Sequence, residues 1–142
     1  MKALYLDANA IAKIYLSDEQ GQDTVSRALD AHEVIASCAV TYAEVAGLFA
    51  RAFHDGRLTE EGYDAATAAF TEEWSSVKIQ RVTDELSRLA AQLMKSQRGL
   101  RALDALHLAS ALALRQSTPI QFLTFDARLQ DAAGKLMPEA LI

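Results

Sequence analysis

Four carboxylates in this chain occupy positions where they could do chemistry together: Asp7, Glu44, Asp104 and Asp126. Asp7 ends the apolar run LYL, and Asp126 ends the run LTF, so each acid closes a segment that reads as a buried strand. Glu44 opens a helical pattern that follows another apolar run, and Asp104 is the sole charged residue in 102–114. A carboxylate buried in apolar surroundings is costly unless it has a partner. We therefore ask what these acids could share.

A cluster of carboxylates favours a divalent cation. Two carboxylates held about 5 Å apart repel each other by roughly 3 kcal/mol at an effective dielectric constant near 20. Four of them must be relieved by protonation or by a bound cation. Carboxylates without His or Cys partners suit hard ions such as Mg²⁺ or Mn²⁺. Such an ion acidifies a bound water, and a second ion can hold the leaving oxygen of a phosphodiester. The acids therefore predict a metal-dependent phosphoryl-transfer site, without choosing its substrate.

The hydrophobic pattern alternates between strands and helices, which positions these acids. Strands are expected at 2–7, 33–38, 77–82 and 120–125, and helices at 9–16, 22–31, 42–56, 59–74, 83–97, 101–115 and 127–136. This order predicts an α/β sandwich with a parallel sheet and right-handed crossovers. Sites in such sheets lie outside the carboxyl ends of the strands. We expect the four acids to converge at that edge.

Each acid also has a purely structural interpretation. Asp7 and Asp126 stand between strand and helix, where an Asp side chain caps the first helical turn. Glu44 completes the sequence TYAE, which fits a capping box with Thr41 at the cap. Asp104 lies near a helix N-terminus, where the helix dipole favours a negative charge. Taken singly, each acid could be a cap, and only the set of four points to a catalytic site.

Size and charge narrow the class of protein. A length of 142 residues predicts one domain, 1–142, with its own core. The net charge of −5 excludes a binder that holds nucleic acid by a bulk basic field, so RNA binding would need a local basic rim or bridging cations. The apolar runs are too short to span a membrane, and Asp7 interrupts the one that a signal peptide would need. A cytoplasmic location is expected. Cys38 has no second thiol to pair with and is interpreted as a core residue.

Four segments of the chain resemble, in order, the signature segments of PIN-domain ribonucleases: LYLDANAIAKIYL, VTYAEV, LRALDALHLASAL and FLTFDARL. The likeness is closest to the VapC toxins of type II toxin–antitoxin pairs, and it runs over almost the whole chain. It implies a PIN-like three-layer α/β/α sandwich with a parallel sheet of four to five strands. It also implies that the four acids bind Mg²⁺ or Mn²⁺ and activate water for endonucleolytic cleavage of RNA.

The same resemblance assigns supporting residues and partners. Asn9 matches a family position that holds Ser, Thr or Asn and supports the first Asp, and Thr124 matches the small hydroxyl residue before the last acid. Ala8 departs from the family, which commonly has a hydroxyl residue there. Such toxins are homodimers, and a VapB-type antitoxin inserts a segment over the active site. Both properties are expected here from the likeness alone.

Some further residues are open to two interpretations. His107 lies three residues after Asp104 and could bond an acid or shuttle a proton, although a core histidine is the more common case. The aromatic residues Tyr63, Phe70 and Trp74 have helical spacing, which indicates core packing or, alternatively, a groove for a dimer or antitoxin partner. The basic residues that could contact RNA phosphates are Arg101, Arg98, Lys13, Arg51 and Arg57. Each of these could equally be solvated surface.

Three rival functions could also use acids at the edge of such a sheet. A haloacid-dehalogenase-like phosphatase needs a D-x-D pair after its first strand, and Asn9 occupies the place of the second Asp. A phospho-acceptor receiver domain needs an acid pair at the first strand and a late Lys, and both are missing. The remaining rival is a catalytically inactive PIN-like binding module, in which the acids only cap helices. Substitution of Asp104 separates that module from an enzyme.

Overall fold

The computed structural model describes residues 2–17 and 20–142. Its elements follow one another in the order β1 (Ala3–Leu6), α1 (Ala8–Tyr15), α2 (Gln22–Asp30), β2 (Val34–Cys38), α3 (Thr41–His54), α4 (Glu60–Trp74), β3 (Lys78–Gln80), α5 (Asp84–Ser96), α6 (Ala102–Leu114), β4 (Ile120–Leu123) and α7 (Ala127–Leu136). The expected elements are all present, and most of their ends agree to within two residues. The strand expected at 77–82 is shorter, because only Lys78–Gln80 pairs with β2.

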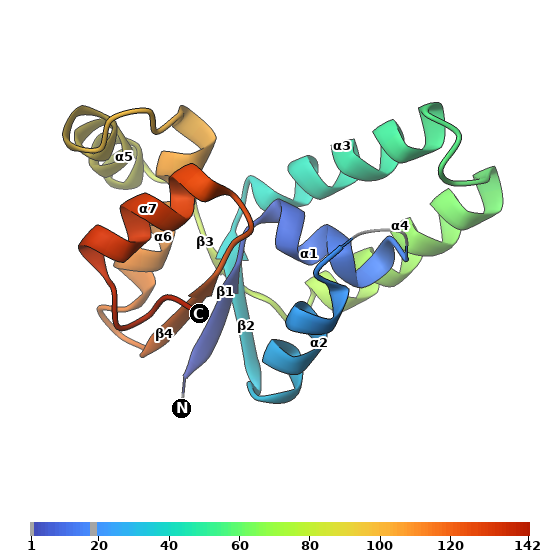
Figure 1. Ribbon diagram of the computed structural model, residues 1–142, viewed down its shortest axis with the longest axis horizontal. Helices are drawn as coiled ribbons and strands as arrows, with labels where there is room; N and C mark the ends of the chain where they lie inside the picture. Colours follow the sequence, from blue (N-terminus) through green and yellow to red (C-terminus); the bar gives the residue numbers. More distant parts are fainter. Residues whose placement is uncertain (1, 18–19) are drawn as a thin grey trace.

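The four strands form one parallel sheet in the order β3-β2-β1-β4. Helices α1 to α4 cover one face of this sheet, and α5 to α7 cover the other (Figure 1). The α/β/α sandwich with a parallel sheet is thereby confirmed, with four strands. Because every strand points the same way, all four carboxyl ends lie at one edge of the sheet.

Strand β1 joins the two halves of the core. Its side chains alternate: Ala3 and Tyr5 pack into the cluster formed with α5, α6 and α7, whereas Leu4 and Leu6 pack into the cluster formed with α1 to α4. All four residues are fully buried. A strand covered on both faces reads as a continuous apolar run, which is why LYL is so apolar. The residue that ends this strand is consequently enclosed by helices from both layers.

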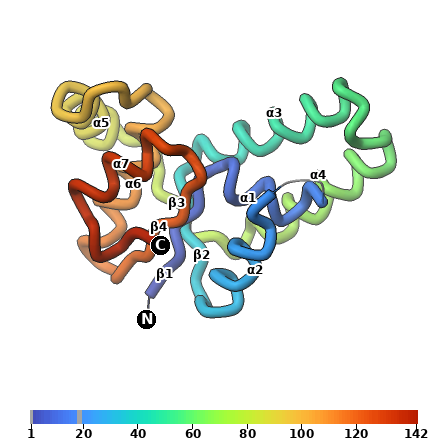
Figure 2. Tube along the Cα trace, viewed as in Figure 1, coloured from blue at the N-terminus to red at the C-terminus, as the bar shows by residue number. Residues whose placement is uncertain are grey.

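The edge of the sheet next to β4 is partly closed by the end of the chain. Phe122 forms a parallel bridge with Leu141, and the Phe122 N–H donates to the carbonyl of Ala140. Figure 2 shows the C-terminal segment running beside β4. This pairing satisfies backbone groups that an edge strand would otherwise leave open.

Helices α3 and α4 form a hairpin that projects away from the sheet (Figure 1). Aromatic side chains hold its base: Phe70 is buried, stacks on Tyr42 with ring centroids 5.0 Å apart, and meets the edge of Phe49. Trp74 packs against both Tyr42 and Phe70. Phe70 is thus a core residue, as the packing interpretation predicts, whereas Tyr63 and Trp74 are only partly buried against the same cluster.

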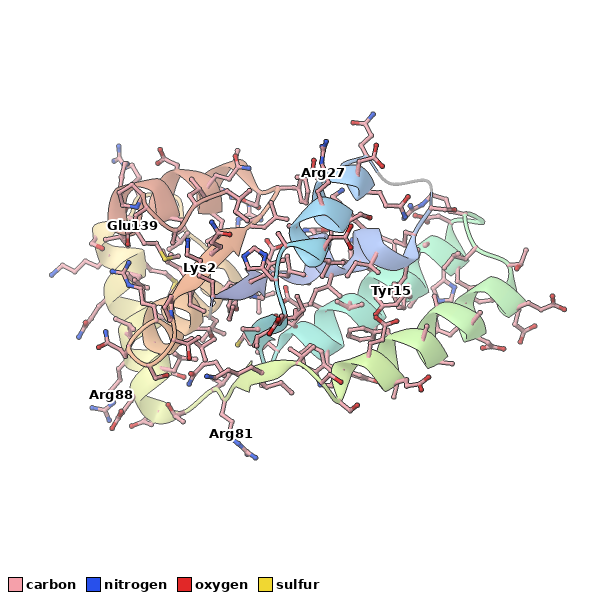
Figure 3. All side chains as sticks on the ribbon, turned by 90° about the horizontal axis from the view of Figure 1, so that it is seen from below. Lys2, Tyr15, Arg27, Arg81, Arg88 and Glu139 are labelled. Carbon is pink, nitrogen blue, oxygen red and sulfur yellow. The ribbon has the colours of Figure 1, made fainter. Side chains whose placement is uncertain are left out.

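Charged side chains lie mainly on the outside. Arg81 extends away from the fold in Figure 3, and Arg88 and Glu139 are also exposed. Across residues 2–17 and 20–142, none of the helices combines the length and the apolar character that crossing a membrane requires.

Candidate active site

The four acids lie where the sheet topology predicts. Asp7 directly follows β1, and Glu44 occupies the first turn of α3, the helix after β2. Asp104 is in the first turn of α6, and Asp126 begins the turn into α7 after β4. The starts of these four helices gather at the carboxyl edge of the sheet (Figure 1). The fold therefore brings carboxylates from distant parts of the sequence to one edge.

Asp7 is a buried carboxylate that has two hydrogen-bond donors. Its Oδ1 accepts from the Ala10 N–H at 3.1 Å, and its Oδ2 accepts from the Thr124 hydroxyl at 2.5 Å. Only 4% of the residue is exposed. Burial raises the pKa of Asp7, and the hydrogen bond from Thr124 opposes that rise. Two hydrogen bonds thus hold the Asp7 carboxylate in place, while burial disfavours its charged form.

Thr124 connects Asp7 to Asp126. Its hydroxyl donates to Asp7 and also accepts the Asp126 N–H at 3.1 Å. The Asp126 side chain caps α7, because its Oδ1 accepts from the N–H groups of Arg128 at 2.9 Å and Leu129 at 3.1 Å. The predicted supporting position of Thr124 therefore corresponds to a direct bond with the first acid.

Glu44 is held by a histidine from α6. Glu44 Oε1 lies 2.7 Å from His107 Nε2, and His107 Nδ1 lies 2.8 Å from the hydroxyl of Tyr5. His107 is buried, and the Glu44 side chain is 24% exposed. His107 thus fits both interpretations of the sequence, since it is a core histidine that bonds an acid.

Asp104 is partly exposed one helical turn before His107. Its Oδ2 accepts the Arg101 N–H at 3.2 Å at the start of α6. Hydrogen bonds therefore connect some of the elements that carry the acids. Thr124 bonds both Asp7 and the Asp126 backbone, and Glu44 bonds His107, which lies on the same helix as Asp104.

The capping alternatives have mixed outcomes. Asp7 and Asp126 do cap α1 and α7. The expected capping box with Thr41 is wrong, because α3 already begins at Thr41 and the cap residue is Val40. The Thr41 hydroxyl is buried against Ser37 Oγ at 2.8 Å. Since Thr41 serves that contact, the Glu44 carboxylate is left to bond His107.

The donor set fits a hard divalent cation. Within the described residues, no three His, Cys, Asp or Glu side chains converge closely enough to form a ready-made metal cage. Mg²⁺ does not need one, because it usually retains several waters and binds through one or two carboxylates. The charge of Glu44 acts on Asp7 and raises its pKa further. This pair of neighbouring carboxylates, repelling each other at a sheet edge, is suited to Mg²⁺ or Mn²⁺.

The other predicted residues fall in two places. Asn9, Arg98 and Arg101 lie beside the starts of α1 and α6. Arg51 is in the last turn of α3, and Arg57 follows that helix, so both lie at its other end. Asn9 is exposed in the first turn of α1, and among the described residues its side chain makes no hydrogen bond to Asp7. Arg98 and Arg101 are exposed just before α6. The ammonium of Lys13 lies 4.8 Å from the centre of the Phe125 ring, next to the turn that carries Asp126.

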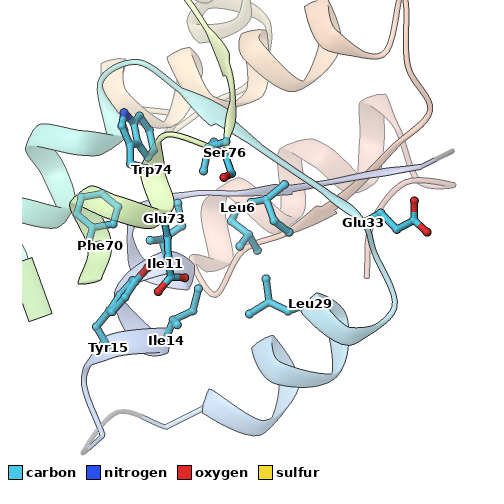
Figure 4. A pocket seen from close by; sticks show the side chains of 12 residues that line it. Leu6, Ile11, Ile14, Tyr15, Leu29, Glu33, Phe70, Glu73, Trp74 and Ser76 are labelled. Atoms are coloured by element: carbon cyan, nitrogen blue, oxygen red, sulfur yellow. The ribbon is translucent and has the colours of Figure 1, made fainter. Parts of the chain in front are cut away.

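A cavity of about 240 Å³ lies away from the acids, between the sheet and helices α1, α2 and α4 (Figure 4). Its wall is mostly apolar, with Leu6, Ile11 and Trp74 among the lining residues. None of the four acids lines it. The candidate site is accordingly the open sheet edge rather than this cavity.

Two residues at the site were not singled out from the sequence. Tyr5 lies two residues before Asp7 and bonds His107 from the centre of the core. A Tyr in a strand buried on both faces needs a partner for its hydroxyl, which was the available signal. Ser37 bonds the Leu6 carbonyl at 2.7 Å, next to Asp7. Nothing in the sequence around Ser37 indicates that contact.

Comparison with known proteins gives the family. The model of the PIN domain family matches residues 4–135 of the chain. Two ribonucleases of Mycobacterium tuberculosis, VapC45 from strain CDC 1551 and VapC49 from strain H37Rv, are each 32% identical over 114 residues. These matches cover 80% of this chain and 78% of each relative.

Solved structures share the fold. VapC20 of Mycobacterium tuberculosis, a toxin that cleaves the sarcin–ricin loop, matches with a TM-score of 0.68 and 19% identity, over 91% of this chain and 94% of its own. A toxin–antitoxin complex from Klebsiella pneumoniae gives a TM-score of 0.68 at 18% identity, over 99% and 95%. VapBC2 of Rickettsia felis, bound to a DNA fragment from its promoter, gives 0.65 at 14% identity, over 100% and 98%. The family match and the two relatives at 32% identity show that this chain belongs to the VapC group of PIN-domain ribonucleases.

Proposed function

We propose that this protein is an endoribonuclease, the toxin of a type II toxin–antitoxin pair, which hydrolyses RNA phosphodiester bonds with Mg²⁺ or Mn²⁺. The observation that carries the proposal is the charge of Glu44, at the start of α3, acting on the buried carboxylate of Asp7 at the end of β1. Asp126 is connected to Asp7 through Thr124, and Asp104 lies on α6, the helix that carries the Glu44 partner His107. RNA as the substrate is supported by the relatives, which are named ribonucleases.

The residues of the chain divide the work in this proposal. A bound divalent cation supplies an acidified water and neutralises charge on the phosphate. Asp7 and Glu44 hold the cation, with Asp104 and Asp126 completing the set from the same edge. Thr124 fixes one oxygen of Asp7, and the first turn of α7 fixes one oxygen of Asp126. The cation also offsets the repulsion between RNA and a chain of net charge −5.

The RNA backbone is proposed to cross the start of α6. Arg98 and Arg101 are exposed there, just before Asp104, whereas Lys13 lies over the Phe125 ring beside the turn that carries Asp126. Contacts of this kind position a phosphate without reading the base. Asn9, exposed in the first turn of α1, is proposed to support the first acid once a ligand is bound.

One observation favours the binding-module alternative. Asp7, Asp104 and Asp126 each accept a backbone N–H at a helix start, so each of the three already has a structural role. In a binding module whose acids only cap helices, replacement of Asp104 would lower stability, and there would be no cleavage activity to lose. An enzyme would lose cleavage while its fold stays intact.

The test is cleavage of a mixed RNA pool by the purified protein. We expect cleavage with Mg²⁺ or Mn²⁺, none with chelator, and none by an Asp104→Asn variant whose circular dichroism matches the wild type. Asp84→Asn is the matched control, because Asp84 is an acid in the first turn of α5 whose exposed carboxylate pairs with Arg88. It should cleave like the wild type. Equal cleavage by the Asp104→Asn variant would contradict the proposed site.

We further propose a homodimer that acts in the cytoplasm and is inhibited by a VapB-type antitoxin. The toxin–antitoxin complexes among the structural relatives support the partner. Light scattering should give twice the chain mass of 15.5 kDa. Induced expression should arrest growth, co-expression of the antitoxin should relieve the arrest, and the Asp104→Asn variant should not arrest growth.

A further inference from the structure

We propose that His107 is a positioning residue that, anchored by Tyr5, holds the Glu44 carboxylate ready for the divalent cation. The inference rests on the proposed function and adds to it a role for buried residues that orient one of the metal ligands. Its basis is the chain of hydrogen bonds Glu44 Oε1 to His107 Nε2, 2.7 Å, and His107 Nδ1 to Tyr5 Oη, 2.8 Å. The chain runs from the partly exposed edge of the sheet to its fully buried centre.

The bonding pattern fixes which atom donates. An ionised carboxylate can only accept, so His107 Nε2 donates to Glu44. The Tyr5 phenol has a hydroxyl proton to donate, and its oxygen lies 2.8 Å from Nδ1, so the hydroxyl donates to that nitrogen. Both bonds are satisfied by one neutral tautomer of the imidazole, with its proton on Nε2. The ring therefore has a defined orientation.

The far end of this chain is rigid. The Tyr5 ring stacks on Phe122 of β4, with centroids 5.2 Å apart and an interplanar angle of 10°. The His107 ring meets the edge of Tyr5 at 5.9 Å and 77°. No side-chain nitrogen or oxygen buried within the described residues lacks a hydrogen-bond partner. The buried polar atoms of Tyr5 and His107 are therefore all hydrogen-bonded. Side chains on β1 and β4, together with α6 itself, thus fix the orientation of the His107 imidazole on the side away from Glu44.

Holding Glu44 in this way favours metal binding. A free Glu side chain at a partly exposed position samples several rotamers, and ordering it costs free energy when a ligand binds. His107 engages Oε1 and, within the described part of the chain, Oε2 makes no hydrogen bond. Oε2 is thus available to a ligand. His107 and Glu44 also act electrostatically on Asp7, so the hydrogen bonds from Tyr5 to Glu44 lie close to the first acid. Partners that orient metal ligands are typically worth about 10- to 100-fold in metal affinity.

Two amide substitutions separate the two nitrogens of the ring. His107→Gln carries its amide N–H near the place of Nε2 and keeps a donor for Glu44, whereas His107→Asn reaches only to the place of Nδ1. Mn²⁺ binding to the purified protein without RNA is measured by calorimetry. We expect His107→Asn to weaken Mn²⁺ binding by about 10- to 100-fold and His107→Gln to stay within about threefold of the wild type.

Tyr5→Phe tests the anchor. It keeps the stacking on Phe122 and removes the hydroxyl that orients the ring, and we expect Mn²⁺ binding to weaken about threefold to tenfold. In cleavage assays kcat should fall along with Mn²⁺ affinity, while the KM for RNA stays unchanged. If Tyr5 acts only through packing, Tyr5→Phe would lower the melting temperature without lowering kcat and Mn²⁺ affinity at an unchanged KM for RNA.

The outcomes are distinct. Wild-type Mn²⁺ affinity in folded His107→Asn, or equal losses in the Asn and Gln variants, would overturn the inference and leave the proposed function standing. If His107→Asn does not fold, unchanged Mn²⁺ affinity in Tyr5→Phe overturns it. If the wild type binds Mn²⁺ no better than Asp7→Asn, the proposed metal site itself fails, and the inference fails with it.

Discussion

Two junctions in this molecule share one local pattern and differ in their surroundings. At the first, β1 ends in Asp7, which caps α1, and at the second, β4 leads into Asp126, which caps α7. Both residues have extended backbone and both accept N–H groups from the first helical turn. Asp7 is 4% exposed with its pKa raised by burial, whereas Asp126 is partly open to solvent.

The difference arises from position in the sheet. β1 lies between β2 and β4, so helices of both layers enclose the residue that follows it. β4 is the last strand of the sheet, and its following turn lies nearer the surface. The local sequence therefore specifies a cap in both places, and the tertiary fold makes one of them a buried charge. Buried charges with perturbed pKa values concentrate at functional sites.

The largest effect that tests this comparison is on cleavage. Asp7→Asn keeps the cap and removes the charge, and we expect cleavage to fall by about 10²- to 10³-fold, the scale of losing one group that stabilises charge at a reacting centre. Asp126→Asn at the exposed junction should cost about tenfold. Single-turnover cleavage of one RNA measures both. Equal losses would show that burial does not distinguish the two acids.

A second test removes the residue that joins the junctions. Thr124→Val preserves the shape of the side chain but leaves Asp7 Oδ2 and the Asp126 N–H without their partner. A buried polar atom left unsatisfied costs about 1–3 kcal/mol, and we expect the free energy of unfolding in urea to fall by that amount. Thr124→Ser keeps the hydroxyl and is the matched control. A valine variant as stable as the serine variant would show that Asp7 finds another donor.

The sequence predicts the elements well and the contacts between them poorly. Apolar periodicity is local, so α6, expected at 101–115, appears at Ala102–Leu114. The rule that sites lie at carboxyl ends of parallel strands places Asp7 and Asp126 at one edge before any contact is known. β3 is shorter than expected because its residues lie at the outer edge of the sheet, where little of the strand is buried.

What the sequence could not supply depends on side-chain geometry across the fold. The bond between Tyr5 and His107 joins residues 102 positions apart, and the bond between His107 and Glu44 spans 63 positions. The capping box expected at Thr41 fits the local sequence, yet α3 already begins at Thr41, whose hydroxyl is buried against Ser37. The roles of the four acids and the single domain 1–142 stay predictions.

A third test uses the pH dependence of stability, measured in chelator so that no cation contributes. The folded pKa of Asp7 is raised above its unfolded value, so the native state retains its proton to higher pH. The stability contributed by that proton is complete below the unfolded pKa of about 3.9 and is lost as pH rises through the folded pKa. At neutral pH the buried charge therefore destabilises the wild type.

Asp7→Asn removes this penalty. We expect its free energy of unfolding at neutral pH to exceed that of the wild type by about 1 kcal/mol, as is common when a functional site is neutralised. The difference should shrink as the pH falls through the raised folded pKa of Asp7 and be smallest below the unfolded pKa of about 3.9. Urea unfolding over this pH range measures it, with Asp126→Asn as control. A variant less stable than the wild type at neutral pH would show that hydrogen bonds to the charge outweigh its burial.

The smallest expected effect concerns the stability of the exposed junction, to which Asp126 should contribute mainly as a helix cap. Asp126→Ala removes the acceptor of the Arg128 and Leu129 N–H groups and should cost about 1 kcal/mol of unfolding free energy. Asp126→Asn offers an equivalent oxygen to the same two donors, so it should cost only a few tenths of a kcal/mol. Thermal unfolding of both variants beside the wild type measures the difference. If the Asn variant loses as much as the Ala variant, the charge of Asp126 stabilises the fold as well as its cap oxygen. In that case the charge of buried Asp7 would destabilise the fold at neutral pH, whereas the charge of exposed Asp126 would stabilise it.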